Sequence, residues 1–195
     1  MITYISIDIE TDGPLIGVNS MLSLGAAAFS LDYQNGYNPL SKFEVNLEPL
    51  PSAIPDQTTM EEFWSKFPEA YKIATTNQKP SAEAILDFIK WYNDLPGEKI
   101  MVGYPSCFDF AWLRHYTILF TGKDILKHEA LDIKSLAAAV LKKPFNQIKT
   151  SRMPSNWRVK SSRAQHKAVD DAVDQGLMLM NILREIKLGS QDCIL

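Results

Sequence analysis

The stretch YISIDIETDG, residues 4–13, places carboxylates at the end of an apolar, β-branched run. Such a run predicts a core strand over residues 2–9. Side chains alternate along a strand, so Asp8 and Glu10 point to the same face, and Asp12 follows two residues later. Because unpaired buried charge is costly, the strand end predicts either partner groups or a divalent cation. The simpler alternative is a water-exposed strand end where one carboxylate caps a turn.

The composition predicts an ordinary globular chain, with one domain over residues 1–195. Of its 195 residues 46% are hydrophobic and 22% are charged, which excludes a disordered protein. The two cysteines, Cys107 and Cys193, match no metal or redox spacing and indicate a reducing compartment. The sequence shows no signal peptide and no stretch that could span a bilayer, so we expect a cytoplasmic protein with no membrane partner. Homodimer formation is left open.

The charge distribution is uneven. The net charge is −3, from 20 basic and 23 acidic residues. Residues 142–169 contain no acidic residue and eight basic ones, so the remainder has 12 basic and 23 acidic residues, a net −11. The eight are Lys142, Lys143, Lys149, Arg152, Arg158, Lys160, Arg163 and Lys167. A basic segment on an acidic body favours a local phosphate contact, and the alternative is a solvated loop.

The order of predicted elements indicates a mixed sheet flanked by helices. Three early strands separated by turn signals predict an antiparallel meander. Helical spacing of apolar residues then alternates with two short strands. Strands are expected at residues 2–9, 21–29, 42–47, 99–104 and 130–131, and helices at 58–66, 81–95, 109–120, 133–141 and 170–186. Asp132 is expected to cap the helix 133–141, and residues 142–165 are expected to form a loop insert.

Two further segments contain residues suited to catalysis. The segment YPSCFDFAWLRHY, residues 104–116, holds a single carboxylate, Asp109, among aromatic side chains. A buried Asp usually has a partner, although simple capping of the helix that begins here is the alternative. In AQHKAVDDAVDQG, residues 164–176, His166 precedes a helix that begins with two aspartates. Histidine is the usual general base near neutral pH, and a surface salt bridge is the alternative.

Together these three segments resemble the motifs of the DEDDh 3′–5′ exonucleases, which have a ribonuclease H-like fold. Asp8 and Glu10 match the first motif, Asp109 the second, and His166 with Asp171 the third. The segment ALDIKSLA, in which Asp132 starts a helix, also resembles the family. Helical spacing alone would favour Asp170, four residues after His166, as the last ligand. The family pattern, with Asp directly before Ala, favours Asp171.

The resemblance implies a fold, a reaction and a set of roles. The fold is a five-stranded mixed sheet, in which a meander is followed by parallel strands. Two Mg²⁺ or Mn²⁺ ions, held by the four carboxylates and bridged by Asp8, would promote phosphodiester hydrolysis from the 3′ end of DNA or RNA, most readily single-stranded. His166 would accept the proton of the attacking water. The backbone near Thr11 would receive the terminal 3′-hydroxyl, and Pro14 would pack on the last base.

Two features depart from the family pattern. Asp12 stands where the family often has Thr or Ser, so this carboxylate either repels phosphate or faces solvent. The insert 142–165 is longer than a minimal member needs. Its Trp157 is expected to stack a base or to pack on the domain, and Arg163 to contact phosphate.

Two other functions fit parts of the sequence. ISIDIETDG resembles the opening of haloacid-dehalogenase-like phosphatases, with Asp8 as nucleophile, but this leaves Asp109 unexplained. An inactive exonuclease-fold protein that binds nucleic acid is the second alternative. The acidic residues present at every motif position argue against it.

Overall fold

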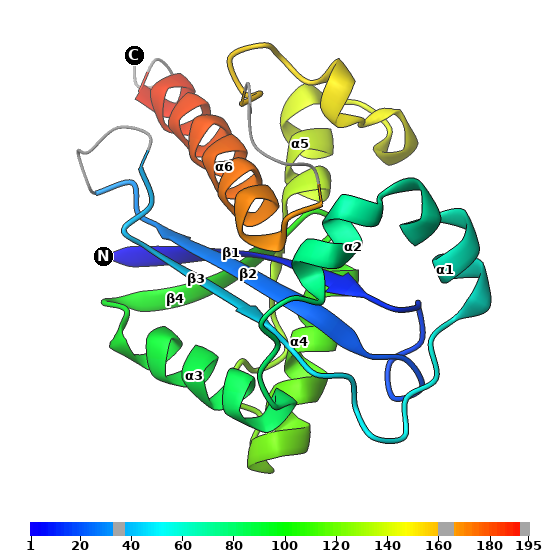
Figure 1. Ribbon diagram of the computed structural model, residues 1–195. Coiled ribbons are helices and arrows are strands. Elements are labelled where there is room, and N and C mark those ends of the chain that lie inside the picture. Colours follow the sequence, from blue (N-terminus) through cyan, green and yellow to red (C-terminus); the bar gives the residue numbers. More distant parts are fainter. Residues whose placement is uncertain (33–37, 160–165, 192–195) are drawn as a thin grey trace.

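Five strands form one mixed sheet in the computed structural model, which describes residues 1–32, 38–159 and 166–191 (Figure 1). The strand order is β3-β2-β1-β4-β5. The pairs β1·β2 and β2·β3 are antiparallel, and β1·β4 and β4·β5 are parallel, which confirms the predicted sheet. The strands are β1 (Ile2–Thr11), β2 (Met21–Phe29), β3 (Ser41–Asn46), β4 (Glu98–Gly103) and β5 (Leu131–Asp132).

The helices largely follow the predicted positions. They are α1 (Gln57–Glu62), α2 (Pro68–Ala74), α3 (Ser81–Asp94), α4 (Ser106–Thr121), α5 (Ile133–Leu141) and α6 (Ala168–Gln191), with 3₁₀ turns η1 (Trp64–Lys66), η2 (Phe145–Gln147) and η3 (Thr150–Arg152). Two differences matter for the site: α2 was not predicted, and α4 begins three residues before Asp109. Among the described helices, none is both long and apolar enough to cross a membrane.

Two hydrophobic cores cover the two faces of the sheet. The first lies between the sheet and α3 and α4, and contains Ile5, Ile7 and Ile9 of β1. The second lies on the other face, where α5 and α6 pack (Figure 1). Since side chains alternate along β1, Asp8 and Glu10 face α6 while the isoleucines face the first core.

The start of α6 lies directly against β2 at Gly25. A Cβ on this residue would lie 2.1 Å from backbone atoms of Ala168 and Val169, a distance that real contacts do not reach. In the sheet, Gly25 is also the partner of Asp8. The missing side chain thus brings the first turn of α6 next to the carboxylate end of β1.

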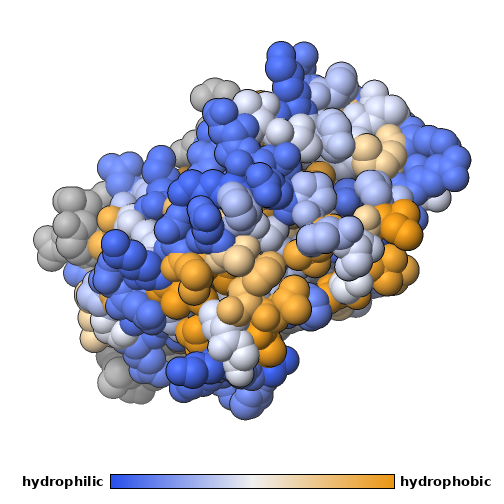
Figure 2. All heavy atoms as spheres, turned by 60° about the horizontal axis from the view of Figure 1, so that its bottom comes forward, coloured by the Kyte–Doolittle hydropathy of each residue, from blue (hydrophilic) through white to orange (hydrophobic). Residues whose placement is uncertain are grey.

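Some apolar side chains remain on the surface. Seen from the lower side of Figure 1, the molecule shows a band of hydrophobic residues bordered by hydrophilic ones (Figure 2). Exposed apolar residues include Leu86 of α3 and Leu119 of α4. Others, including Leu15 and Val18, lie in the connection between β1 and β2, directly after the carboxylate end of β1.

We expect Gly25→Ala to lower the free energy of unfolding by about 1–3 kcal/mol, the usual cost of inserting atoms into a packed interface. The clash is with helix backbone, which cannot move without displacing α6. Urea denaturation measures the change. Ser23→Ala, on the same face of β2, is the control and should cost much less. Equal stability of Gly25→Ala and the wild type would show that α6 is not held against this strand.

Candidate functional site

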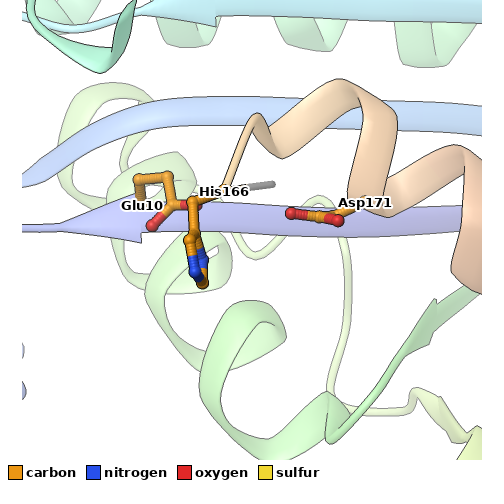
Figure 3. Close-up of side chains that lie close together, drawn as sticks. All are labelled: Glu10, His166 and Asp171. Atoms are coloured by element: carbon orange, nitrogen blue, oxygen red, sulfur yellow. The ribbon is translucent and has the colours of Figure 1, made fainter. Parts of the chain in front are cut away.

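Three side chains from opposite ends of the sequence meet at the carboxylate end of β1 (Figure 3). Glu10 is the second-to-last residue of β1, His166 lies just before α6, and Asp171 lies in the first turn of α6. One ligand atom of each lies within 4.8 Å of the others. The structure places Asp171 in this group, and Asp170 does not belong to it.

Asp8 and Asp109 border the same group. Asp8 Oδ1 accepts a hydrogen bond of 2.8 Å from Gln175 Nε2, one turn after Asp171 on α6. Asp109 is 5% exposed, and its Oδ1 accepts from the backbone N–H of Ile9 at 3.2 Å. The second motif is thereby tied to the strand that carries the first.

The electrostatics show a cluster of carboxylates without enough counter-charge. Burial, followed by the charges of Asp171 and Asp109, raises the pKa of Glu10 to about 8. Burial raises the pKa of Asp109 to about 7, against the lowering effect of the Ile9 hydrogen bond. Burial and the other carboxylates also raise the pKa of Asp8 well above its usual range.

The pKa of Asp171 is subject to opposing influences. Burial raises its pKa, and the neighbouring His166 opposes this through its charge and a backbone hydrogen bond. The raised pKa values thus reflect the cost of ionising four carboxylates in one buried place. Carboxylate oxygens with one imidazole suit a hard divalent cation such as Mg²⁺ or Mn²⁺. The donor set therefore fits a cation that supplies the missing positive charge.

The imidazole of His166 is held by two aromatic rings. Its ring centroid lies 5.0 Å from that of Phe63 and 4.4 Å from that of Phe67. Its backbone is left-handed, with φ of 59°. This conformation is uncommon for a non-glycine residue, so His166 lies on the turn before α6 and not on the helix itself. Helical i, i+4 spacing to Asp170 consequently does not apply.

The same aromatic segment also contacts the end of β1. Trp64 Nε1 donates a hydrogen bond of 3.0 Å to the carbonyl of Thr11. The hydroxyl of Thr11 donates to the carbonyl of Gly13 at 2.8 Å. A substrate that contacts the carbonyl or the hydroxyl of Thr11 would share or replace one of these internal hydrogen bonds. Pro14 is exposed, next to the exposed Leu15, so its side chain is accessible to a base.

The expectation that Asp12 faces solvent is wrong. The residue is 2% exposed and accepts a hydrogen bond from the backbone N–H of Ser20. The sheet register shifts between Glu10 and Thr11. Such an irregularity breaks the alternation and re-aims the following side chain. Asp12 therefore closes the β1–β2 connection.

Asp109 does not cap its helix. Helix α4 has Pro105 as its N-cap, so Asp109 lies inside the first turn and its carboxylate is directed to β1. The expected cap at Asp132 is confirmed: Oδ1 accepts from the N–H of Ser135 at 2.6 Å. Its Oδ2 accepts from the N–H of Ser106, which links the starts of α4 and α5.

The basic insert requires one correction. Trp157 is 0% exposed, and its Nε1 donates to Glu185 Oε2 of α6 at 2.5 Å. It belongs to the second core, so no ring face is open to a base, and the expected stacking is wrong. Arg163 lies outside the described residues.

Some residues of the site carry no motif signal. Gln175 could have been found from its i, i+4 spacing to Asp171 on a predicted helix. Phe63 and Trp64 lie in the helix predicted over residues 58–66, and Phe67 follows it directly. Nothing local in their sequence relates them to His166, which follows about a hundred residues later.

Comparison with known proteins places this geometry in context. No family model matches the chain. The 3′-5′ DNA exonuclease Cap18 of Escherichia coli is 27% identical over 143 residues. That match covers 68% of this chain and 66% of Cap18, just under two thirds of its length.

Solved structures match at low identity but over almost the whole chain. The nuclease domain of 3′hExo, a DEDDh family member bound to rAMP, has a TM-score of 0.71 at 12% identity, covering 94% of this chain and 92% of that domain. The chain has the same fold as this nuclease domain. Exonuclease I matches at a TM-score of 0.67 and 13% identity, covering 95% of this chain and 41% of that protein. The Mg²⁺- and Mn²⁺-bound Pop2p of S. pombe matches at 0.63 and 16%, covering 92% and 82%. The fold that the resemblance of the three motifs implies is confirmed.

We expect the metal-free protein to lose stability as the pH rises from about 5 to about 8. In the unfolded chain the carboxylates ionise near pH 4, whereas Glu10 and Asp109 keep their protons in the folded state up to about pH 8 and 7. The folded state then binds more protons, so the free energy of unfolding falls across this interval.

Urea denaturation in EDTA at several pH values tests this linkage. Glu10→Gln should show a flatter dependence, because it removes one of the shifted groups. Mg²⁺ should restore stability mainly above pH 7, where the carboxylates must ionise to bind it. Identical pH dependences for the wild type and Glu10→Gln would contradict the assigned shift.

Asp171→Asn should weaken Mn²⁺ binding much more than Asp170→Asn does. The two residues are adjacent and partly buried, so each variant is the matched control for the other. Only Asp171 lies in the group with Glu10 and His166. Titration followed by Mn²⁺ electron paramagnetic resonance measures the affinities. A larger loss in Asp170→Asn would mean that the wrong aspartate has been assigned.

Proposed function

We propose that the protein is a metal-dependent 3′–5′ exonuclease that hydrolyses phosphodiester bonds from the free 3′ end of DNA or RNA. The observation that carries this proposal is the meeting of four carboxylates and one histidine from three distant segments on a DEDDh fold. A structural role for such a cluster is disfavoured, because buried carboxylates repel one another unless a cation is bound.

The proposed ligands of two Mg²⁺ or Mn²⁺ ions are Asp8, Glu10, Asp109 and Asp171. When bound, such ions offset the repulsion between the carboxylates, polarise the scissile phosphate and lower the pKa of water. Gln175 fixes Asp8 by its amide hydrogen bond, and the N–H of Ile9 fixes Asp109. These contacts orient the ligands before any cation arrives, as outer-shell partners commonly do.

His166 is the proposed general base. It would take a proton from the water that attacks phosphorus, and the bond to the 3′-oxygen of the preceding nucleotide would break. The products are a nucleoside 5′-monophosphate and a chain shortened by one residue. The rings of Phe63 and Phe67 limit the orientations of the imidazole. This restriction favours one proton-transfer geometry.

The proposed substrate is a nucleic-acid strand with a free 3′ end, single-stranded most readily. Similar proteins act on DNA or bind a ribonucleotide, so both DNA and RNA are kept as substrates. Cap18 is a DNA exonuclease, and the 3′hExo nuclease domain was solved with rAMP. A complex of E. coli Exonuclease I with single-stranded DNA also matches the fold, at a TM-score of 0.60. The exposed Pro14 and Leu15 are the proposed contacts for the terminal base.

The phosphatase alternative is not supported, since it requires a different fold. The first strand pairs antiparallel with the second, and the structures that match include exonucleases. The inactive nucleic-acid-binding alternative differs from the proposal only in turnover. End-labelled DNA and RNA, single- and double-stranded, incubated with Mg²⁺ or with EDTA, would distinguish binding from hydrolysis and identify the preferred substrate.

Asp8→Ala should reduce this hydrolysis by more than about 100-fold, since even residues that only support metal ligands contribute about 10- to 100-fold. Its stability at neutral pH should be equal or higher, because one of several repelling carboxylates is removed. Asp94→Ala, an exposed aspartate at the end of α3, is the control. Near-native turnover by Asp8→Ala would rule out the proposed two-metal mechanism.

A further inference from the structure

Residues 142–159 form a lobe that is fixed in place although it contains little regular structure. Three of its side chains are buried in the second core: Ile148, Met153 and Trp157. Trp157 is additionally hydrogen-bonded to Glu185 of α6. The lobe is therefore anchored at three points along its length.

Each buried anchor has an exposed basic neighbour. Lys149 follows Ile148, Arg152 precedes Met153, and Arg158 follows Trp157. Because the anchors are fixed, the adjacent cations are presented at defined positions. Among the described residues none of these three forms an ion pair, whereas Lys167 at the start of α6 pairs with Glu44 at 3.2 Å.

Two of these neighbours, Lys149 and Arg152, line one small cavity together with a third basic residue of the lobe, Lys143. Its volume is about 150 Å³, and Lys143, Lys149 and Arg152 line it, with no carboxylate among its lining residues. A cavity with three cationic and no anionic side chains suits a phosphate group. Nothing in the DEDDh carboxylate site requires this second feature.

The cationic cavity adjoins the carboxylate site through η3. A second cavity, of about 280 Å³, is lined by Asp8, Asp171, Thr150 and Arg158. Thr150 begins η3 and Arg152 ends it, so this single turn contributes to both cavities. Arg158 Nη1 also donates to the carbonyl of Ser151, in the middle of the same turn. A strand leaving the carboxylate site on this side would reach the cationic cavity next.

We propose that the lobe binds the sugar-phosphate backbone of the substrate strand on the 5′ side of the scissile bond, with a phosphate in the cavity of Lys143, Lys149 and Arg152. The proposal rests on the exonuclease function proposed above. The rest of the chain has a net charge of −11 outside residues 142–169, which disfavours binding of a polyanion there. Phosphate contacts position a strand without reading its bases, so no sequence preference is expected from this lobe.

The test is the triple variant Lys143→Gln, Lys149→Gln, Arg152→Gln. Its matched control removes three exposed lysines from other elements: Lys42→Gln, Lys90→Gln and Lys123→Gln. The substrates are a dinucleotide, which spans one phosphate, and a 20-nucleotide single strand. Binding of the long strand is measured separately by fluorescence anisotropy in EDTA, where no turnover occurs.

The lobe variant should raise KM for the long strand about tenfold and leave kcat unchanged, since individual exposed ion pairs are weak but three act together. Dinucleotide cleavage should not change. The slope of log affinity against log salt should become shallower by about 2, as expected for three lost contacts to a single strand. Lys149→Arg, which keeps the charge, should behave as the wild type.

The outcomes separate the two proposals. If the wild type cleaves the long strand and the lobe variant matches it in KM, affinity and salt slope, the lobe is not the backbone site, although the exonuclease function stands. If the wild type cleaves neither substrate, the exonuclease function fails, and the anisotropy experiment still decides whether the lobe binds strands. An equal loss in the control variant would also overturn the proposal, because it would show an effect of net charge alone.

Discussion

The close contact between the first turn of α6 and Gly25 of β2 is the constraint on which the site depends. Asp8 is the sheet partner of Gly25, so a helix that lies against the glycine must also lie beside the carboxylate. Asp171 and Gln175 then reach the end of β1 from the same helix face. The two hydrophobic cores of the sheet provide the stability that the clustered carboxylates reduce.

Charge is separated along this chain in a way that matches its proposed chemistry. The carboxylates gather at one strand end, where a bound cation would offset their repulsion, and exposed basic residues gather on one anchored lobe. Because Thr150 and Arg158 line a cavity together with Asp8 and Asp171, the two regions of opposite sign are adjacent. If the lobe binds the strand as proposed, this arrangement would attract a polyanion to the lobe, while the net negative charge of the remainder would disfavour other approaches.

The sheet and the acidic positions could be predicted because both depend on local pattern. Alternation along the first strand and the residue that follows it, residues 2–10, placed Asp8 and Glu10 on one face, and turn signals gave the meander. What could not be predicted depends on contacts distant in sequence. The register shift that turns Asp12 inward is set by pairing with β2, and the burial of Trp157 by a partner 28 residues later.

Boundaries were the other source of error. Helix α2 is only seven residues long and follows a 3₁₀ turn almost directly, so its periodicity was too short to recognise. Helix α4 begins at Ser106 because Asp132 accepts its N–H, and this partner lies 26 residues further along. Helical spacing from His166 favoured Asp170, whereas the family pattern favoured Asp171, the residue that lies beside Glu10 and His166. The spacing argument failed because the turn containing His166 is not helical.

The segment from Phe63 to Phe67 has a consequence for how the site can change. Trp64 donates a hydrogen bond to the end of β1, the strand that carries the first motif. Phe63 and Phe67 pack against the imidazole of His166, which belongs to the third motif. Five consecutive residues thus connect the strand end that carries the proposed metal ligands to the proposed general base. A substitution or insertion here would move both at once, so rate and metal affinity would vary together even though no acidic residue had been altered.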